Sequence, residues 1–156
     1  MATHVSTPHT SVRDSAAPLA PSRSLDLLAP IGRVLIGLLF VLFGTGHFAA
    51  ATIGYAAQSG VPFAGVLVPL SGVMAIAGGL GVALGYRTRL AALLLVAFLV
   101  PITFAMHAYW KETDAMAAMT QRIMFFKNLG LLGAALLLVQ RGAGPYSLDA
   151  RRPSRA

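Results

Sequence analysis

Residues 34–86 decide the fold class, and they read VLIGLLFVLFGTGHFAAATIGYAAQSGVPFAGVLVPLSGVMAIAGGLGVALGY. None of these 53 consecutive residues is Asp, Glu, Lys or Arg. One crossing of a hydrocarbon layer about 30 Å thick takes roughly 20 residues as an α-helix. The stretch is therefore long enough for two crossings and the turn between them, and it predicts an integral membrane protein.

The composition of the whole chain supports this class. Of the 156 residues, 56% are apolar and 11% are charged, whereas a soluble domain has about 25% charged residues. The net charge of +7 does not predict a nucleic-acid partner, because the cations lie at the predicted membrane boundaries instead of on one face. The chain contains no cysteine, which excludes thiol redox chemistry, Cys-ligated iron–sulfur clusters and covalently attached haem.

The predicted fold class is all-α, an integral membrane bundle of four transmembrane helices. The spans are expected at about 27–51, 63–85, 90–110 and 120–140, within a transmembrane domain over 27–141. Residues 53–62 are expected to form an uncharged turn. Residues 1–26 are rich in Ser, Thr, Pro and Ala and are expected to be a disordered cytoplasmic tail, and 142–156 a basic cytoplasmic tail.

The distribution of cations predicts the orientation. In a four-span arrangement, nine of the twelve basic residues fall on the side of the two termini and three on the other side. By the positive-inside rule, both termini are predicted to lie in the cytoplasm, with the chain in a bacterial cytoplasmic (inner) membrane. We interpret Arg33, Arg87 and Arg89 as topology anchors.

Small residues recur on single helix faces of the predicted spans. Gly37 and Gly44 lie seven positions apart in the first span, and the second span contains Ala75 with Gly79 and Gly81 with Gly85. Such faces let helices approach closely in lipid, where burial of apolar surface cannot drive association. The spacing predicts close helix contacts, above all for the second span.

A few polar side chains occur within the spans, and all are predicted to lie in the outer half of the bilayer. His47 is near the end of the first span, His107 and Trp110 end the third, and Lys127 and Asn128 open the fourth. Ionisable groups are expensive inside a membrane, so by default they are candidates for function. We therefore predict a shallow polar pocket in the outer leaflet formed by these five residues.

Each candidate also has a structural interpretation. The Lys127 ammonium can reach a lipid head group, pair with Glu112 or Asp114, or bind a ligand oxygen. The two histidines suit a proton relay, a quinone carbonyl donor or, as a weaker alternative, the axial ligands of a haem b, while interfacial imidazoles bonded to backbone or water are the simplest interpretation. Trp110 fits the aromatic belt or a wall that stacks on a quinone. No metal-binding spacing is present.

Several motifs together resemble the DoxX family of small four-helix membrane proteins. They are GRVLIGLLF at 32–40, Gly78-Gly79 followed by Gly85 and Thr88-Arg89, HAYW at 107–110, FKNL at 126–129 and GPYSLD at 144–149. The resemblance covers about residues 31–151. It implies a subunit of a quinone-linked oxidoreductase or of a respiratory or redox-stress system, with membrane or peripheral oxidoreductase subunits as partners besides the lipid bilayer.

The leading hypothesis is thus a membrane subunit that binds a quinone in the polar pocket and has no catalytic cofactor of its own. The alternative is a non-enzymatic scaffold or lipid-binding subunit, in which Lys127 faces lipid head groups. A small-solute transporter is a third and weaker hypothesis, because neither an internal repeat nor a broken helix is evident. A homo-oligomer stays open.

Overall fold

The computed structural model describes residues 25–151. Within that range the chain forms helices α1 (Leu28–Gly44), α2 (Ala50–Gln58), α3 (Ala64–Leu84), α4 (Thr88–Met106) and α5 (Ala115–Arg141), with 3-10 turns η1 (Leu25–Leu27), η2 (Thr45–Phe48) and η3 (Tyr109–Lys111). Four segments are long and apolar enough to cross a membrane: Leu25–Phe48, Ala64–Leu84, Thr88–Lys111 and Ala115–Arg141. The predicted all-α bundle with four membrane spans is confirmed. Most of the tail predicted as disordered, residues 1–26, lies outside the described residues.

The largest difference from the expected boundaries is α2. Residues 53–62 were predicted to be a turn, yet most of this stretch is helical. The sequence AATIGYAAQ of α2 is rich in alanine, the best helix former, and its Ala56 is buried in a small cluster with Ala64 and Val68. Tertiary packing and alanine content therefore make a helix of a segment that was placed as the turn between the first and second spans.

The start of α5 also lies earlier than expected. The fourth span was expected from about residue 120, but α5 begins at Ala115. The carboxylate of Asp114 caps the helix by accepting a hydrogen bond from the backbone N–H of Ala117 at 2.8 Å. A side-chain cap of this kind satisfies one of the free N–H groups at a helix N-terminus. At 27 residues, α5 is about 40 Å long and exceeds the hydrocarbon thickness.

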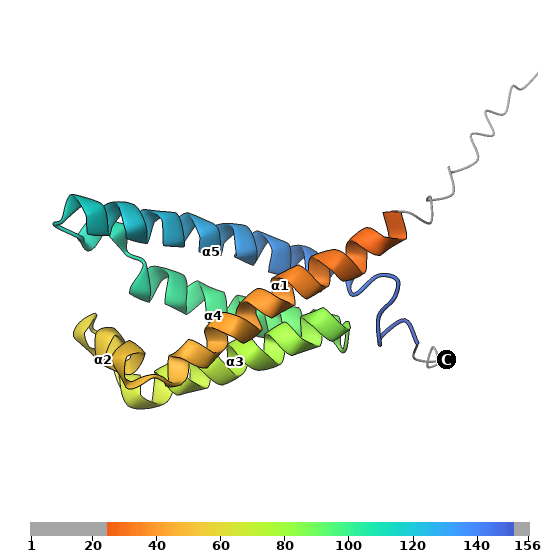
Figure 1. Cartoon of the computed structure of the whole chain (residues 1–156), viewed down its shortest axis with the longest axis horizontal. Coiled ribbons are helices and arrows are strands. Elements are labelled where there is room, and N and C mark those ends of the chain that lie inside the picture. Colours follow the sequence, from red (N-terminus) through yellow and green to blue (C-terminus); the bar gives the residue numbers. More distant parts are fainter. Residues whose placement is uncertain (1–24, 152–156) are drawn as a thin grey trace, which may run out of the picture.

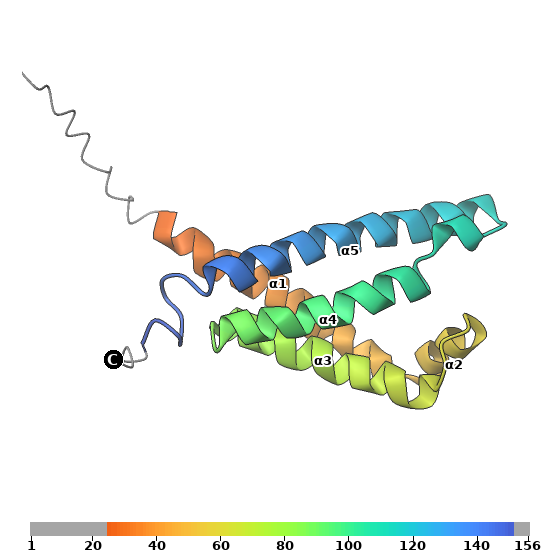
Figure 2. The same ribbon diagram turned by 180° about the vertical axis from the view of Figure 1, so that it is seen from behind.

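The long helices follow one another in space in the order α1, α3, α4, α5, and the main contacts join neighbours in this order. Figures 1 and 2 show that α1 and α5, the outermost two, meet at the end of the molecule where α1 begins and α5 ends, and diverge toward the opposite end. We call these the terminal end and the open end. The short helix α2 lies at the open end beside α3 (Figure 1).

Glycines bring α1 and α3 into backbone contact. Gly37 faces Gly79, and Gly44 faces Gly72, so the seven-residue spacing on one helix matches that on the other. A Cβ added to Gly79 would lie 2.7 Å from the carbonyl oxygen of Gly37, and one added to Gly72 would lie 3.0 Å from that of Gly44. No larger residue fits at these positions without displacing a helix, as expected for close packing in lipid.

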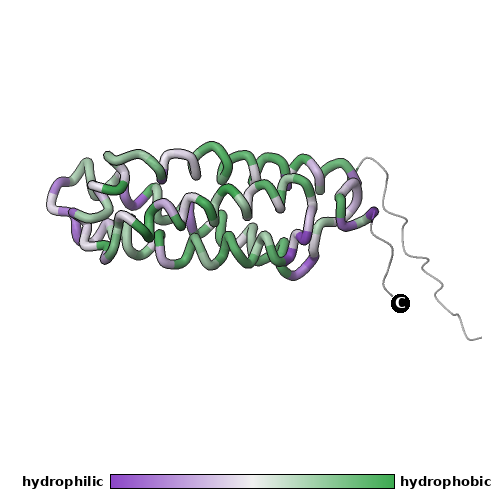
Figure 3. Tube along the Cα trace, turned by 90° about the horizontal axis from the view of Figure 1, so that it is seen from below, coloured by the Kyte–Doolittle hydropathy of each residue, from purple (hydrophilic) through white to green (hydrophobic). Residues whose placement is uncertain are grey.

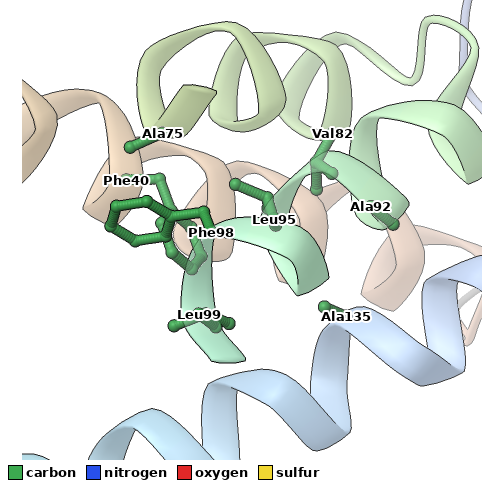
Figure 4. Close-up of a cluster of buried hydrophobic side chains, with 8 residues drawn as sticks. All are labelled: Phe40, Ala75, Val82, Ala92, Leu95, Phe98, Leu99 and Ala135. Atoms are coloured by element: carbon green, nitrogen blue, oxygen red, sulfur yellow. The ribbon is translucent and has the colours of Figure 1, made fainter. Parts of the chain in front are cut away.

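The core contains apolar side chains from all four long helices (Figure 4): Phe40 of α1, Ala75 and Val82 of α3, Ala92, Leu95, Phe98 and Leu99 of α4, and Ala135 of α5. The rings of Phe40 and Phe98 meet edge to face, with centroids 6.0 Å apart. Hydrophilic residues gather at the two ends of the bundle, with an apolar belt between them (Figure 3). This pattern is that of a multi-pass membrane protein.

A buried arginine closes the terminal end. Arg33 is only 2% exposed, and its guanidinium donates hydrogen bonds to the backbone carbonyl oxygens of Ala143, Pro145 (3.2 Å) and Tyr146 (2.8 Å). Residues 143–149, which we call the clasp, are thereby fixed against α1. The charge of Arg33 is used inside the protein to satisfy three carbonyl groups, and its predicted role as a topology anchor stays a prediction.

The clasp also caps α4. The carboxylate of Asp149 accepts hydrogen bonds from the backbone N–H groups of Arg87 (2.7 Å) and Thr88 (2.8 Å) and from the hydroxyl of Thr88 (2.9 Å). Gly85, with φ of +65°, lies directly against Ser147. The clasp therefore joins α1, the α3–α4 turn and the end of α5. The side chains of Arg87 and Arg89 are exposed at this end, and their anchoring role stays a prediction.

Candidate functional site: a polar cavity at the open end

Polar side chains from η2, from the residue after α4 and from α5 line a cavity of about 120 Å³ toward the open end. Four of the five residues predicted as a pocket contribute to its wall: His47, His107, Lys127 and Asn128. The rest of the wall is apolar and includes Phe43. The residues come together because α1 and α4 end at this level, whereas α5 passes it with its middle, where Lys127 and Asn128 lie.

Asn128 is the most deeply buried of the four. It is 6% exposed, and its side-chain amide has no hydrogen-bond partner among residues 25–151. The amide atoms are accessible from the cavity, because within residues 25–151 the fully buried side-chain atom without a partner is Nε of Arg33 and not an atom of Asn128. The Asn128 amide therefore offers both a donor and an acceptor to whatever occupies the cavity.

Lys127 lies too far along α5 to form the predicted ion pair with an acid near the helix start. Asp114 precedes it by 13 positions, which corresponds to about 20 Å of helix rise, and Glu112 lies further back still. The ammonium instead lies 6.0 Å from the ring centroid of Phe43, at the outer limit of a cation–π contact. Lys127 is exposed and lines the cavity, so its charge is available to an anion.

Each histidine at the cavity is held through its Nδ1 atom. His47, in η2, bonds Ser71 Oγ of α3 at 2.7 Å. His107, just after α4, bonds Oε1 of Gln121 at 2.7 Å, and the amide nitrogen of Gln121 donates to the Tyr55 hydroxyl at 2.9 Å. We call His107, Gln121 and Tyr55 the strap, because they connect α4, α5 and α2 across the open end.

The sequence did not point to the residues that hold the two imidazoles. Ser71 and Tyr55 lie in uncharged segments, and Gln121 lies in the polar stretch before the fourth span. Their side chains give no periodic signal, so only the fold identifies them.

Trp110 does not line the cavity. It packs with Tyr109 and Phe125, at centroid distances of 5.1 and 5.6 Å, and is 54% exposed. These aromatic rings lie at the open end of the bundle, where an aromatic belt is expected at the membrane interface. The structure thus separates Trp110 from the other four predicted residues.

A second, larger cavity lies on the other side of Phe98. It measures about 280 Å³, lies between α3 and α4 beside α2, and has an almost entirely apolar wall. His47, Phe98 and Ile102 contribute to both cavities and so form the partition between them. Within residues 25–151, no group of three His, Cys, Asp or Glu side chains is placed to hold a metal ion.

Comparison with known proteins identifies the family. The family model of the SURF4 family matches residues 22–154. The chain belongs to the SURF4 family. Two relatives are inner membrane proteins of Escherichia coli K12: YqjF is 34% identical over 126 residues, covering 80% of this chain and 91% of the relative, and YphA is 32% identical over 128 residues, covering 80% and 90%.

A SURF4-family relationship also extends to yeast. The ER-derived vesicles protein ERV29 of Saccharomyces cerevisiae is 29% identical over 80 residues, which cover 51% of this chain and 26% of ERV29. No solved structure matches the chain significantly. The bacterial relatives match over nearly their whole length and are membrane proteins, in agreement with the four spans.

Membership of the SURF4 family corrects two predictions. The resemblance to the DoxX family is wrong, and with it the hypothesis of a quinone-linked oxidoreductase subunit with oxidoreductase partners, because the family match covers 22–154 and the relatives carry no such description. The motifs that suggested DoxX consist largely of Gly, Leu and aromatic residues. Membrane helices of many families favour these residues for packing and interfacial contacts.

Proposed function

We propose that this SURF4-family protein is an integral membrane protein that binds a ligand. It holds the anionic head group of an amphiphilic ligand in the cavity beside Lys127 and Asn128, while the apolar chain of the ligand stays in the hydrocarbon. The observation that carries the proposal is the Asn128 amide, 6% exposed and without a partner among the described residues, next to a lysine with no acid in reach. A ligand with anionic oxygens would satisfy both groups.

The size and position of the cavity favour an amphiphile over a fully enclosed solute. Its volume is about 120 Å³, whereas sites that enclose a drug-sized ligand measure roughly 300–1,000 Å³. Only a small head group fits. Because the cavity wall includes the exposed Phe43 of α1 and the exposed Lys127 of α5, the remainder of the ligand can leave between these helices into the lipid.

We place the cavity in the outer leaflet. The terminal end carries Arg87, Arg89, Arg141 and Arg151, and the positive-inside rule then assigns this end to the cytoplasm. The chain has no cysteine, so a single Ser59→Cys in the α2–α3 turn is a clean probe. We expect a membrane-impermeant maleimide to label it in intact cells; labelling only after the cells are broken would reverse the orientation.

The binding proposal is tested by comparing Lys127→Met with Lys111→Met. Both variants lose one positive charge at the open end. Lys111 is absent from the cavity wall, so only Lys127→Met removes a charge from the cavity. In phosphatidylglycerol-containing nanodiscs, Lys127→Met should weaken binding of this lipid about 10-fold or more, the value of a hydrogen bond to a charged group. Lys111→Met should stay within about 2-fold.

Asn128→Leu provides a second variant with no change of charge. It fills the position with a side chain of similar size and removes the amide. Binding should fall while the helical circular dichroism signal stays unchanged. Equal binding of the anionic lipid by the parent, Lys127→Met and Asn128→Leu, all folded, would refute the proposed function.

A further inference from the structure

The hydrogen bonds of His47 determine which of its ring nitrogens carries a proton. Ser71 Oγ donates its single proton to the carbonyl oxygen of Val68 at 2.7 Å, and a carbonyl can only accept. The second contact of the hydroxyl, to His47 Nδ1 at 2.7 Å, therefore needs a proton from the imidazole. His47 is a donor at Nδ1.

His107 reaches the same state through the strap. Its Nδ1 contacts Oε1 of Gln121 at 2.7 Å, and an amide oxygen can only accept. The amide nitrogen of Gln121 is occupied as a donor to Tyr55. His107 therefore also carries its proton on Nδ1.

A neutral imidazole protonated at Nδ1 is an acceptor at Nε2. Neither Nε2 atom has a hydrogen-bond partner among the residues that the structure describes. The wall of the cavity thus combines one ammonium, one free amide and two imidazoles whose remaining nitrogens accept hydrogen bonds. A ligand that supplies only anionic oxygens accepts hydrogen bonds from Lys127 and from the amide nitrogen of Asn128. It brings no donor for the amide oxygen of Asn128 or for the histidines.

We infer that the head group carries hydroxyl groups beside its anionic oxygens, as the glycerol phosphate head group of an anionic lipid does. This inference rests on the proposed function and specifies its ligand. The phosphate oxygens face Lys127, and the glycerol hydroxyls donate to Nε2 of His47 and His107. An ethanolamine head group also has donors, but its ammonium would lie beside the like charge of Lys127, which disfavours it.

The experiment compares two lipids of equal charge and equal acyl chains. Phosphatidylglycerol has two hydroxyls on its head group, and phosphatidylmethanol has the same phosphodiester without them. Each is titrated against the purified full-length chain in micelles, with displacement of a fluorescent phosphatidylglycerol as the readout. We expect phosphatidylglycerol to bind about 5-fold tighter or more, the effect of one to two neutral hydrogen bonds. Equal affinities would overturn the inference.

Variants assign the preference to the imidazoles. His47→Leu and His107→Leu should each reduce the preference for phosphatidylglycerol and leave the affinity for phosphatidylmethanol unchanged. Tyr55→Phe is the matched control, because it breaks the strap at the Gln121–Tyr55 bond but keeps the bond from His107 Nδ1 to Gln121 Oε1. If Tyr55→Phe lowers the preference as much as His107→Leu does, the role of His107 is structural and its part of the inference is refuted.

Failure of the inference and failure of the proposed function give different results. If Lys127→Met weakens both lipids but the parent binds them equally, only the hydroxyl inference is wrong. If Lys127→Met binds both lipids as the parent does, the proposed function is wrong. If soluble glycerol 1-phosphate displaces the probe at the same concentration as phosphatidylglycerol, the head-group chemistry holds, and the requirement for an apolar chain is refuted.

Discussion

The two ends of the bundle each hold a cation on an apolar helix, but they satisfy it differently. At the terminal end, Arg33 is buried and donates to three carbonyl groups of the clasp. At the open end, the structure of residues 25–151 gives Lys127 no ion pair with an acid and gives the amide of its neighbour Asn128 no hydrogen-bond partner. At the terminal end the chain supplies acceptors for both terminal nitrogens of Arg33, although its Nε has no partner within residues 25–151. At the open end the Asn128 amide faces the cavity, as expected where one end is structural and the other binds a ligand.

The largest effect is expected when the two cations are removed in turn. Arg33→Met leaves three carbonyls without a donor, so it should lower the free energy of unfolding by about 3 kcal/mol or more. Lys127→Met should leave the free energy of unfolding unchanged or raise it, because the substitution removes an unpaired charge from a membrane-spanning helix. Unfolding by SDS can be followed through Trp110, the single tryptophan of the chain. If both variants lowered the free energy of unfolding equally, the proposed difference between the two ends would be wrong.

Two glycines with positive φ sharpen the comparison with a smaller effect. Gly85 (φ +65°) lies against Ser147 of the clasp, whereas a Cβ on Gly60 (φ +86°) at the open end would meet nothing within 4 Å. Gly60→Ala should cost only the backbone strain, about 1 kcal/mol. Gly85→Ala adds a steric clash and should cost about 2–3 kcal/mol in the same SDS titration. Equal costs would mean that the clasp contributes little to stability.

The smallest effect is expected from Tyr55→Phe, which removes one hydrogen bond of the strap. It should lower the free energy of opening at the open end by about 1 kcal/mol and leave the clasp unaffected. Hydrogen exchange of residues 50–58 should become a few-fold faster, while exchange of residues 143–149 stays the same. A uniform change along the chain would show that the strap stabilises the whole bundle instead of its open end.

The membrane spans could be predicted because charge is the dominant signal in a bilayer. The 53 uncharged residues leave no other fold, and the scarcity of polar residues within the spans pointed to His47, His107, Lys127 and Asn128, which the structure places around one cavity. Their role in binding stays a proposal. Trp110, chosen for its type and position, lies in an aromatic cluster instead.

The remaining features depend on partners distant in the sequence. Arg33 acts on carbonyls more than 100 residues away, so the positive-inside rule could not distinguish a buried arginine from a surface anchor. The helix α2 depends on packing against α3, and short motifs of common membrane residues could not separate the SURF4 family from another four-span family. In each case the deciding interaction is tertiary or extends over the whole chain.

The backbone contacts between Gly37 and Gly79 and between Gly44 and Gly72 determine which half of the molecule can move. With no side chain between the two backbones, no rotamer change can adjust their separation, so α1 and α3 form one rigid body. Any widening of the cavity must come from displacement of α4 and α5 relative to that body, with the clasp as the pivot. Binding of a ligand in the cavity would thus change the distance between α1 and α5 and leave the distance between α1 and α3 constant.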